Sequence, residues 1–282
     1  MKLETLVSGR VFLEGPRWHD GALWVSDMHA DEVLRITENG DVEVVARVAA
    51  QPSGLGWLPN GDMLIVSMTD RKLLRRTSAG ALHLHADMSE HIDRRANDMV
   101  VDTNGRAYIG NFGFDFDAGE APKATVLLRV DPDGSVSVAA EGVSFPNGMV
   151  ITPDGKTLIV AETFGRQLTA FDIAEDGSLS NRRVWAELPE GAVPDGICLD
   201  SAGGIWAASP TTKDCIRVEE GGAVTDRIST GDAQAIACML GGADGRKLFI
   251  LTAETTHRKA CQEKKSAAIL TVQVTHAHAG RP

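Results

Sequence analysis

The sequence lacks the features that mark membrane, exported and nucleic-acid-binding proteins. No apolar run approaches the ~20 residues of a membrane-spanning helix, and no N-terminal stretch joins a basic start to an apolar middle as a signal peptide does. Basic residues are scarce relative to acidic ones, 28 Lys and Arg against 39 Asp and Glu, which gives a net charge of −11. That excess of acidic residues argues against a basic surface that binds the phosphate backbone of nucleic acids. We therefore expect a cytoplasmic protein with no membrane or nucleic-acid partner.

Cysteine and nucleotide-binding motifs are also scarce. Four cysteines are present, without the close spacing of a metal motif, so we expect free buried thiols. No glycine-rich loop follows a strand and opens a helix, which leaves nucleotide chemistry unsupported. No serine at the candidate site has a partnered histidine, which argues against a serine hydrolase triad.

The sequence does contain a sixfold repeat. A turn carrying glycine, followed by an apolar strand, recurs at intervals of 40 to 50 residues, with marker glycines Gly21, Gly61, Gly105, Gly155, Gly203 and Gly245. Further apolar or alternating segments follow each marker strand, as at 33–36 and 42–45 in the first repeat. A repeat of this length, built of short strands and turns, is typical of a β-propeller blade.

The repeat predicts an all-β fold, a six-bladed β-propeller with four antiparallel strands per blade. No low-complexity linker divides the chain, so we expect residues 1–282 to form a single domain. The sixth repeat ends after its third strand, near Val274. We expect residues 1–10 to supply its missing outer strand, which closes the ring and removes an exposed edge, and residues 275–282 to form a tail. The alternative is an open array with frayed ends.

Polar residues recur at one phase of the repeat, where the inner strands begin. Glu14 lies seven residues before its marker glycine, and Asn97, Asn147 and Asp195 lie eight before theirs. Equal phase should place these side chains at the same height in the central channel. Without a balancing lysine, the two carboxylates would repel each other and the amides would lack partners, and a bound cation resolves both problems.

The ligand chemistry narrows the choice of metal. Every side chain at this phase offers oxygen, and no His or Cys shares it, so a hard cation such as calcium, magnesium or manganese is favoured. Blade two has Ser53 at this phase, and blade six has Gln234 or Ala235 nearby. The alternative is that these residues only cap strand starts and turns, where Asn, Asp and Gly are common.

Four segments carry a family resemblance that covers residues 10 to 255. They resemble the gluconolactonase and regucalcin (senescence marker protein) family at 13–18, 95–98, 145–148 and 194–196. The resemblance implies a six-bladed propeller with metal ligands at Glu14, Asn147 and Asp195. It also implies that Asn97 binds water or substrate beside the metal, and that Arg95 grips substrate oxygens. One divalent cation is implied, with calcium expected and zinc, magnesium, manganese or iron as alternatives.

The resemblance implies a metal-dependent hydrolase that opens a sugar lactone, or a related small lactone, to its hydroxy acid. The metal would polarise the carbonyl oxygen while water attacks the carbon. Asp195 is our candidate for the base that accepts the water proton, and a metal hydroxide is the alternative. A promiscuous esterase or phosphotriesterase, or a non-catalytic calcium-binding propeller, are the alternative functions. The expected partner is a small-molecule lactone, and the expected state is a monomer or weak oligomer.

Three neighbouring features complete the prediction. The loop 111–117 is rich in phenylalanine, and with Phe145 and Phe164 it favours a less polar lactone or a sugar face stacked on a ring, unless these rings only pack between blades. Asp98 should point away from the channel and act structurally. Asp27 is expected to be an ordinary turn carboxylate.

Overall fold

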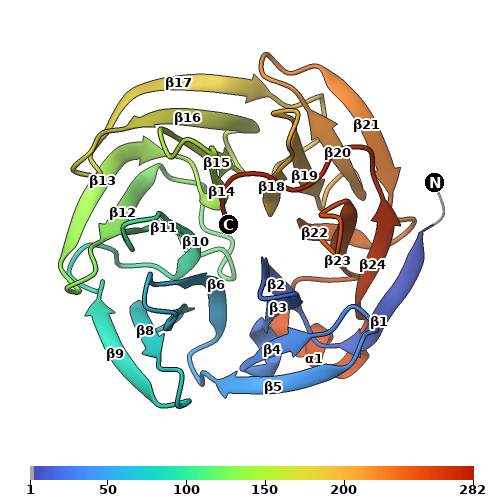
Figure 1. Ribbon diagram of the computed structural model, residues 1–282, viewed down its shortest axis with the longest axis horizontal. Coiled ribbons are helices and arrows are strands. Elements are labelled where there is room, and N and C mark those ends of the chain that lie inside the picture. Colours follow the sequence, from blue (N-terminus) through green and yellow to red (C-terminus); the bar gives the residue numbers. More distant parts are fainter. Residues whose placement is uncertain (1–2) are drawn as a thin grey trace.

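The computed structural model describes residues 3–282 as six four-stranded antiparallel sheets arranged around a central axis (Figure 1). The innermost strand of each sheet lies nearest the axis, and the chain moves outward strand by strand. This confirms the predicted six-bladed propeller.

Each blade uses consecutive strands, apart from the last. Blades one to three consist of β2 (Leu13–His19), β3 (Ala22–Asp27), β4 (Glu32–Ile36) and β5 (Val42–Arg47); β6 (Pro52–Trp57), β7 (Met63–Ser67), β8 (Lys72–Arg76) and β9 (Leu82–Asp87); and β10 (Ala96–Val101), β11 (Ala107–Asn111), β12 (Thr125–Val130) and β13 (Val136–Val143). Blades four and five consist of β14 (Pro146–Ile151), β15 (Thr157–Glu162), β16 (Gln167–Ile173) and β17 (Leu179–Glu187); and β18 (Ile197–Leu199), β19 (Ile205–Ser209), β20 (Asp214–Val218) and β21 (Val224–Ser229).

Blade six combines the two ends of the chain. It consists of β22 (Gln234–Gly241), β23 (Lys247–Ala253), β24 (Ala267–Gln273) and β1 (Glu4–Arg10). Two short helical segments lie outside the sheets, the 3₁₀ turn η1 (Met28–Ala30) and the helix α1 (Arg258–Lys264).

Burial follows the distance of a strand from the axis. The inner strands β10 and β14 are buried along their whole length, whereas the outer strand β9 is mostly exposed. The core therefore lies between the faces of neighbouring blades, with Trp206 and Phe249 among its largest fully buried side chains. All four cysteines are free and buried, as expected.

The ring closes through the N-terminal strand, as predicted. β1 pairs antiparallel with β24, where Glu4 lies opposite Thr271. A fully buried carboxylate secures the junction between β1 and β2: Asp27 accepts hydrogen bonds from the backbone N–H of Phe12 at 2.8 Å and from Arg10 Nε at 3.0 Å. The expectation that Asp27 is an ordinary turn carboxylate is therefore wrong, because its partners lie 15 and 17 residues away.

Glycine allows neighbouring inner strands to approach closely. A Cβ on Gly148 would lie 2.6 Å from the backbone nitrogen of Ile197, and one on Gly196 would overlap the Cβ of Ala237. The backbones meet instead, through a bond from the N–H of Gly148 to the carbonyl of Asp195 at 3.1 Å. The inner strands of blades four, five and six are thus drawn together at the end of the channel where they begin.

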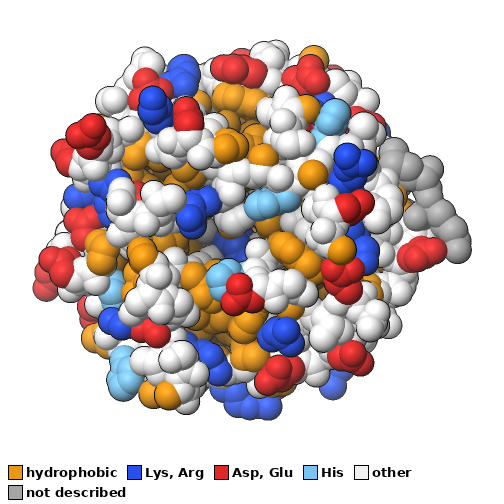
Figure 2. All heavy atoms as spheres, in the orientation of Figure 1, with side chains coloured by type: hydrophobic (Ala, Val, Ile, Leu, Met, Phe, Trp, Pro, Cys, Tyr) orange, Lys and Arg blue, Asp and Glu red, His pale blue; other side chains and the backbone are white. Residues whose placement is uncertain are grey.

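The C-terminal segment crosses the other end of the channel. Arg281 forms an antiparallel bridge with Ile151, and His278 forms one with Asp200, so the segment runs along the far ends of β14 and β18. In Figure 1 the carboxyl terminus accordingly lies near the centre of the ring. Figure 2 shows acidic and basic side chains interspersed around the rim, without a continuous basic surface on the face in view. Within residues 3–282 no helix is long and apolar enough to cross a membrane.

The closure contact predicts a stability effect. Asp27→Asn keeps the side chain's shape but turns an amide donor toward other donors, so we expect the free energy of unfolding to fall by about 1–3 kcal/mol. Chemical denaturation measures the change. Asp20→Asn, at an exposed turn, should stay within about 0.5 kcal/mol. Equal effects of the two substitutions would contradict the assigned role of Asp27.

Candidate active site

A cavity of about 410 Å³ opens at the end of the channel where the inner strands begin. All five side chains singled out from the sequence line it: Glu14, Arg95, Asn97, Asn147 and Asp195. Gln234 of blade six lines it as well. In blade two the matching residue Ser53 does not line the cavity, and Gln51, two residues earlier, does.

Two carboxyl groups share this cavity without a basic partner. Burial, followed by the negative charge of Asp195, raises the pKa of Glu14 well above its usual range. Burial raises the pKa of Asp195 to about 8, against the opposing effect of a hydrogen bond from Asn147. Among residues 3–282 neither carboxyl group forms an ion pair with Lys, Arg or His. The pair therefore lacks an ion-pair partner, and Arg17, which is already paired with Asp98, is the cation that lowers the pKa of Glu14 against the effect of burial.

The amide of Asn147 is oriented by its neighbours. Its Nδ2 donates to Asp195 Oδ1 at 2.5 Å and to Thr163 Oγ1 at 3.2 Å, and Thr163 Oγ1 donates to the carbonyl of Pro194 at 2.8 Å. Both hydrogens of the amide are used, which leaves its carbonyl oxygen as the group available to a ligand. Asn97 is held similarly, since its Nδ2 donates to the carbonyl of Pro146 at 3.3 Å. Carboxylate and amide oxygens together form a donor set suited to a hard divalent cation.

Arg95 lies at the mouth of the cavity and has a partner that sequence analysis missed. Its Nη2 donates to Asp117 Oδ2 at 2.5 Å, and its backbone carbonyl accepts from the N–H of Phe112 at 3.0 Å. Both contacts come from residues 112–124, the segment between β11 and β12. The guanidinium therefore faces the cavity and also anchors the phenylalanine-rich loop.

A buried ion pair outside the cavity lining acts electrostatically on Glu14. Arg17 Nη2 donates to Asp98 Oδ1 at 2.5 Å, and Arg17 Nε donates to the carbonyl of Leu55 at 2.8 Å, so this arginine joins blades one, two and three. Arg17 also lines a separate hollow on the far side, beside Arg281 and Pro282. Asp98 is engaged by Arg17 rather than turned into the cavity, in agreement with a structural role.

His29 also lines the cavity, although no histidine shared the phase of the predicted site. Its Nδ1 lies 2.9 Å from Gln51 Nε2, and its Nε2 lies 3.1 Å from the carbonyl of Thr256. The partners assign Nε2 as the protonated nitrogen and Nδ1 as an acceptor. Burial lowers the pKa of His29. With both nitrogens engaged, His29 orients Gln51 and is not free to act as a base.

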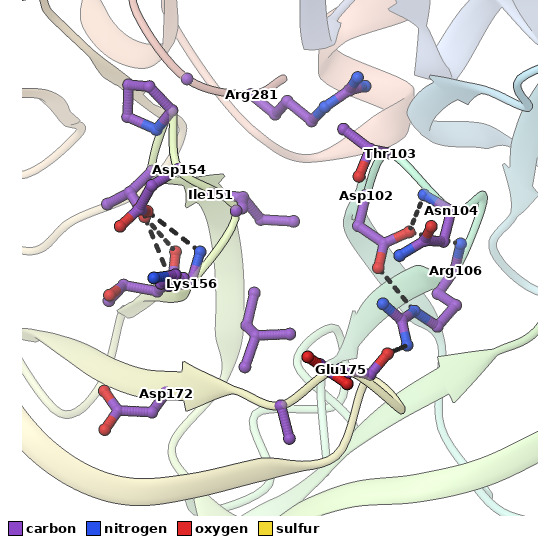
Figure 3. Close-up of a pocket in the computed structure, with 17 residues that line it drawn as sticks. Asp102, Thr103, Asn104, Arg106, Ile151, Asp154, Lys156, Asp172, Glu175 and Arg281 are labelled. Carbon is purple, nitrogen blue, oxygen red and sulfur yellow. Dashed lines mark hydrogen bonds and ion pairs between the residues drawn. The ribbon is translucent and has the colours of Figure 1, made fainter.

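A larger hollow, of about 1100 Å³, lies between blades three and four and contains none of the predicted site residues. Figure 3 shows Arg106 between Asp102 and Glu175 in its wall. Arg106 Nε donates to the carboxylate of Asp102 at 2.6 Å, and Nη1 donates to the carbonyl of Glu175 at 2.8 Å. These bonds stabilise the turns of the two blades, and we assign no chemistry to this hollow.

The unpaired carboxyl groups predict how stability depends on pH when divalent metal is absent. The native state retains a proton on Asp195 that the unfolded chain loses near pH 4. The contribution of Asp195 to the free energy of unfolding in chelator should therefore fall as pH rises from about 4 to 8. Glu14 acts in the same direction, because its pKa is raised too.

Urea denaturation at several pH values measures this slope, and Asp195→Asn should flatten it. Asp154→Asn is the control. Its carboxyl pKa is lowered by the hydroxyl of Thr152, so this group titrates below the window. Wild-type and Asp195→Asn curves that run parallel over this range would contradict the assignment.

Comparisons with known proteins identify a family that matches most of the chain. A family model described as the SMP-30/gluconolactonase/LRE-like region matches residues 12–254. The pentonolactonase of Haloferax volcanii is 28% identical over 251 residues, which cover 85% of this chain and 81% of that protein.

Two solved structures are also similar. Regucalcin of Agrobacterium tumefaciens, described as a calcium-binding protein, has a TM-score of 0.81 at 22% identity, and the match covers 99% of this chain and 95% of that one. A gluconolactonase of Xanthomonas campestris has a TM-score of 0.75 at 25% identity, covering 97% and 89%. Because the family model spans most of the sequence, the chain belongs to the SMP-30/gluconolactonase/LRE-like family, which includes lactonases, as the sequence resemblance predicted.

Proposed function

We propose that this protein is a divalent-metal-dependent lactonase whose ligands are Glu14, Asn147 and Asp195. The observation that carries the proposal is the meeting of two carboxyl groups, without a basic partner, beside an amide whose nitrogen is already engaged. Membership of a family with named lactonases supports the reaction class. Calcium is the ion we propose, because all the donors are oxygen.

The donor set fits such an ion. Its charge would offset the cost of burying two carboxylates, which is the largest cause of their raised pKa values. When bound, the ion supplies positive charge that polarises the lactone carbonyl and stabilises the developing oxyanion.

Asp195 is proposed to transfer the proton from the attacking water to the ring oxygen. Its Oδ1 is held by Asn147, so Oδ2 is the atom proposed to accept a proton from the attacking water. The water oxygen bonds to the carbonyl carbon, the bond from that carbon to the ring oxygen breaks, and the ring oxygen takes the proton back. The product is the open hydroxy acid, and no oxidant or other co-reactant is needed.

Arg95 and Asn97 are proposed to orient the lactone. The guanidinium can donate two parallel hydrogen bonds to ring and carbonyl oxygens. Its pairing with Asp117 is exposed at the mouth, so a substrate oxygen can compete for the same donors. Fixing the ring in one orientation lowers the entropic part of the barrier.

The first test removes the proposed base and ligand. Asp195→Asn should lower kcat for lactone hydrolysis by at least about 100-fold and weaken calcium binding measured by calorimetry. Chelator should abolish wild-type activity and added calcium should restore it. Asp154→Asn, at the opposite end of the channel, serves as the control. Undiminished metal-stimulated hydrolysis by Asp195→Asn would refute the assignment, and calcium binding without any ester hydrolysis would favour a non-catalytic protein.

The second test separates substrate binding by Arg95 from its contact with the loop. Arg95→Met should raise KM by about tenfold, because it removes the donors to the lactone. Asp117→Asn breaks the same ion pair but leaves the guanidinium in place, so its KM should stay near the wild-type value. Steady-state kinetics on one lactone measures both. Equal defects in the two variants would mean that Arg95 acts only through the loop.

A further inference from the structure

Five phenylalanine rings form one continuous wall, and four of them line the cavity mouth. They come from the segment 112–124 and from the starts of blade four and of its β15–β16 loop: Phe112, Phe114, Phe116, Phe145 and Phe164. Ring centroids of contacting pairs lie between 4.4 and 6.5 Å apart. The wall faces Glu14 and Asp195 across the cavity.

Two of the rings are partly exposed to solvent, whereas two others are buried. Phe114 and Phe145 are 3% and 7% exposed, whereas Phe116 and Phe164 are 40% and 39% exposed. The other exposed large apolar side chains among residues 3–282 lie on the outermost strands, away from the cavity: Val42, Val44, Leu82, Leu84, Val138, Val184 and Val224. Exposed aromatic surface is thus concentrated where a ligand would bind.

The exposed rings are held in place. The tip of the segment closes on itself, with the N–H of Glu120 bonded to the carbonyl of Asp115 at 3.0 Å and the N–H of Gly119 to that of Phe116 at 3.1 Å. Phe164 contacts Phe114 and Phe145 edge to face, at interplanar angles of 76° and 73°. A surface ordered before the ligand arrives loses little entropy on binding.

Several hydroxyl and imidazole groups of the cavity already donate or accept hydrogen bonds within the protein. Thr211 Oγ1 donates to the carbonyl of Gly191 at 2.6 Å, and Thr69 Oγ1 donates to that of Ala50 at 3.2 Å. The hydroxyl of Thr163 and both nitrogens of His29 are engaged as well. The phenyl rings themselves offer no hydrogen-bonding atoms, so sugar hydroxyls placed against them would lack partners, and buried hydroxyls without partners weaken binding.

We propose that the substrate is a lactone carrying an aryl substituent, a specificity that rests on the proposed lactonase function. The lactone carbonyl lies at Glu14, Asp195 and Arg95, and the aryl group lies against Phe116 and Phe164. An aryl group is favoured over an alkyl chain because aromatic pairs gain more than their buried area alone provides. A cavity of about 410 Å³ has the size typical of sites for such compounds.

Kinetics on three δ-lactones tests the specificity: a phenyl-substituted ring, the unsubstituted ring and a hydroxylated sugar lactone. The wild-type kcat/KM should be highest for the phenyl compound, by about tenfold or more over the unsubstituted ring. Phe116→Ala/Phe164→Ala should remove that preference through KM and leave the unsubstituted ring within about twofold. Leu84→Ala, an exposed apolar residue on β9, is the matched control. A preference for the sugar lactone, or a double variant that keeps the phenyl preference, would overturn the proposal.

A binding measurement separates this proposal from the lactonase assignment. Phenyl-substituted tetrahydropyran has no carbonyl and cannot be hydrolysed, so calorimetry on chelator-treated protein reports the aryl site alone. We expect binding that weakens about tenfold in the double phenylalanine variant and is unchanged in Leu84→Ala. If no lactone is hydrolysed but this binding pattern holds, the lactonase function fails and the aryl site stands. If the compound does not bind, or binds all variants equally, the aryl site fails whatever the enzyme hydrolyses.

Discussion

The site depends on how closely the backbones of neighbouring inner strands can approach. Asn147 and Asp195 each precede a glycine, and a Cβ on either glycine would collide with the next blade. Without it, the N–H of Gly148 reaches the carbonyl of Asp195. In each short motif the first residue supplies an oxygen atom to the cavity. The glycine that follows allows the neighbouring inner strands to lie close together at that height. The side chains converge because the main chains do.

Periodic features could be predicted from the sequence, and long-range contacts could not. The six marker glycines gave the blade count, and the common phase of Glu14, Asn97, Asn147 and Asp195 placed them in one cavity. Their roles, and that of Arg95, came from the family resemblance. Asp27 was misjudged because its partners Arg10 and Phe12 join it only when the ring closes.

The contacts of His29 and Asp117 were missed for a related reason. Both residues follow marker strands, in η1 and in an irregular loop, where no repeat defines a phase. The cavity combines these loop residues with the regular inner strands, so its two walls differ. One wall contains two buried carboxyl groups, and the other is made of phenyl rings. A poorly solvated site strengthens the electrostatic effects on which the proposed chemistry depends.

The position of the buried Arg17 bears on how ligands enter and leave the protein. Its side chain joins three blades and lines the hollow beside Arg281 and Pro282, and this hollow shares no lining residue with the cavity of the carboxyl groups. The cavity and the hollow are therefore separate spaces. If the proposed function holds, a ring-opened acid would leave by the opening through which the next ring arrives, past the same phenyl groups. Departure and arrival would then exclude each other in time, and accumulated product would compete directly with fresh substrate.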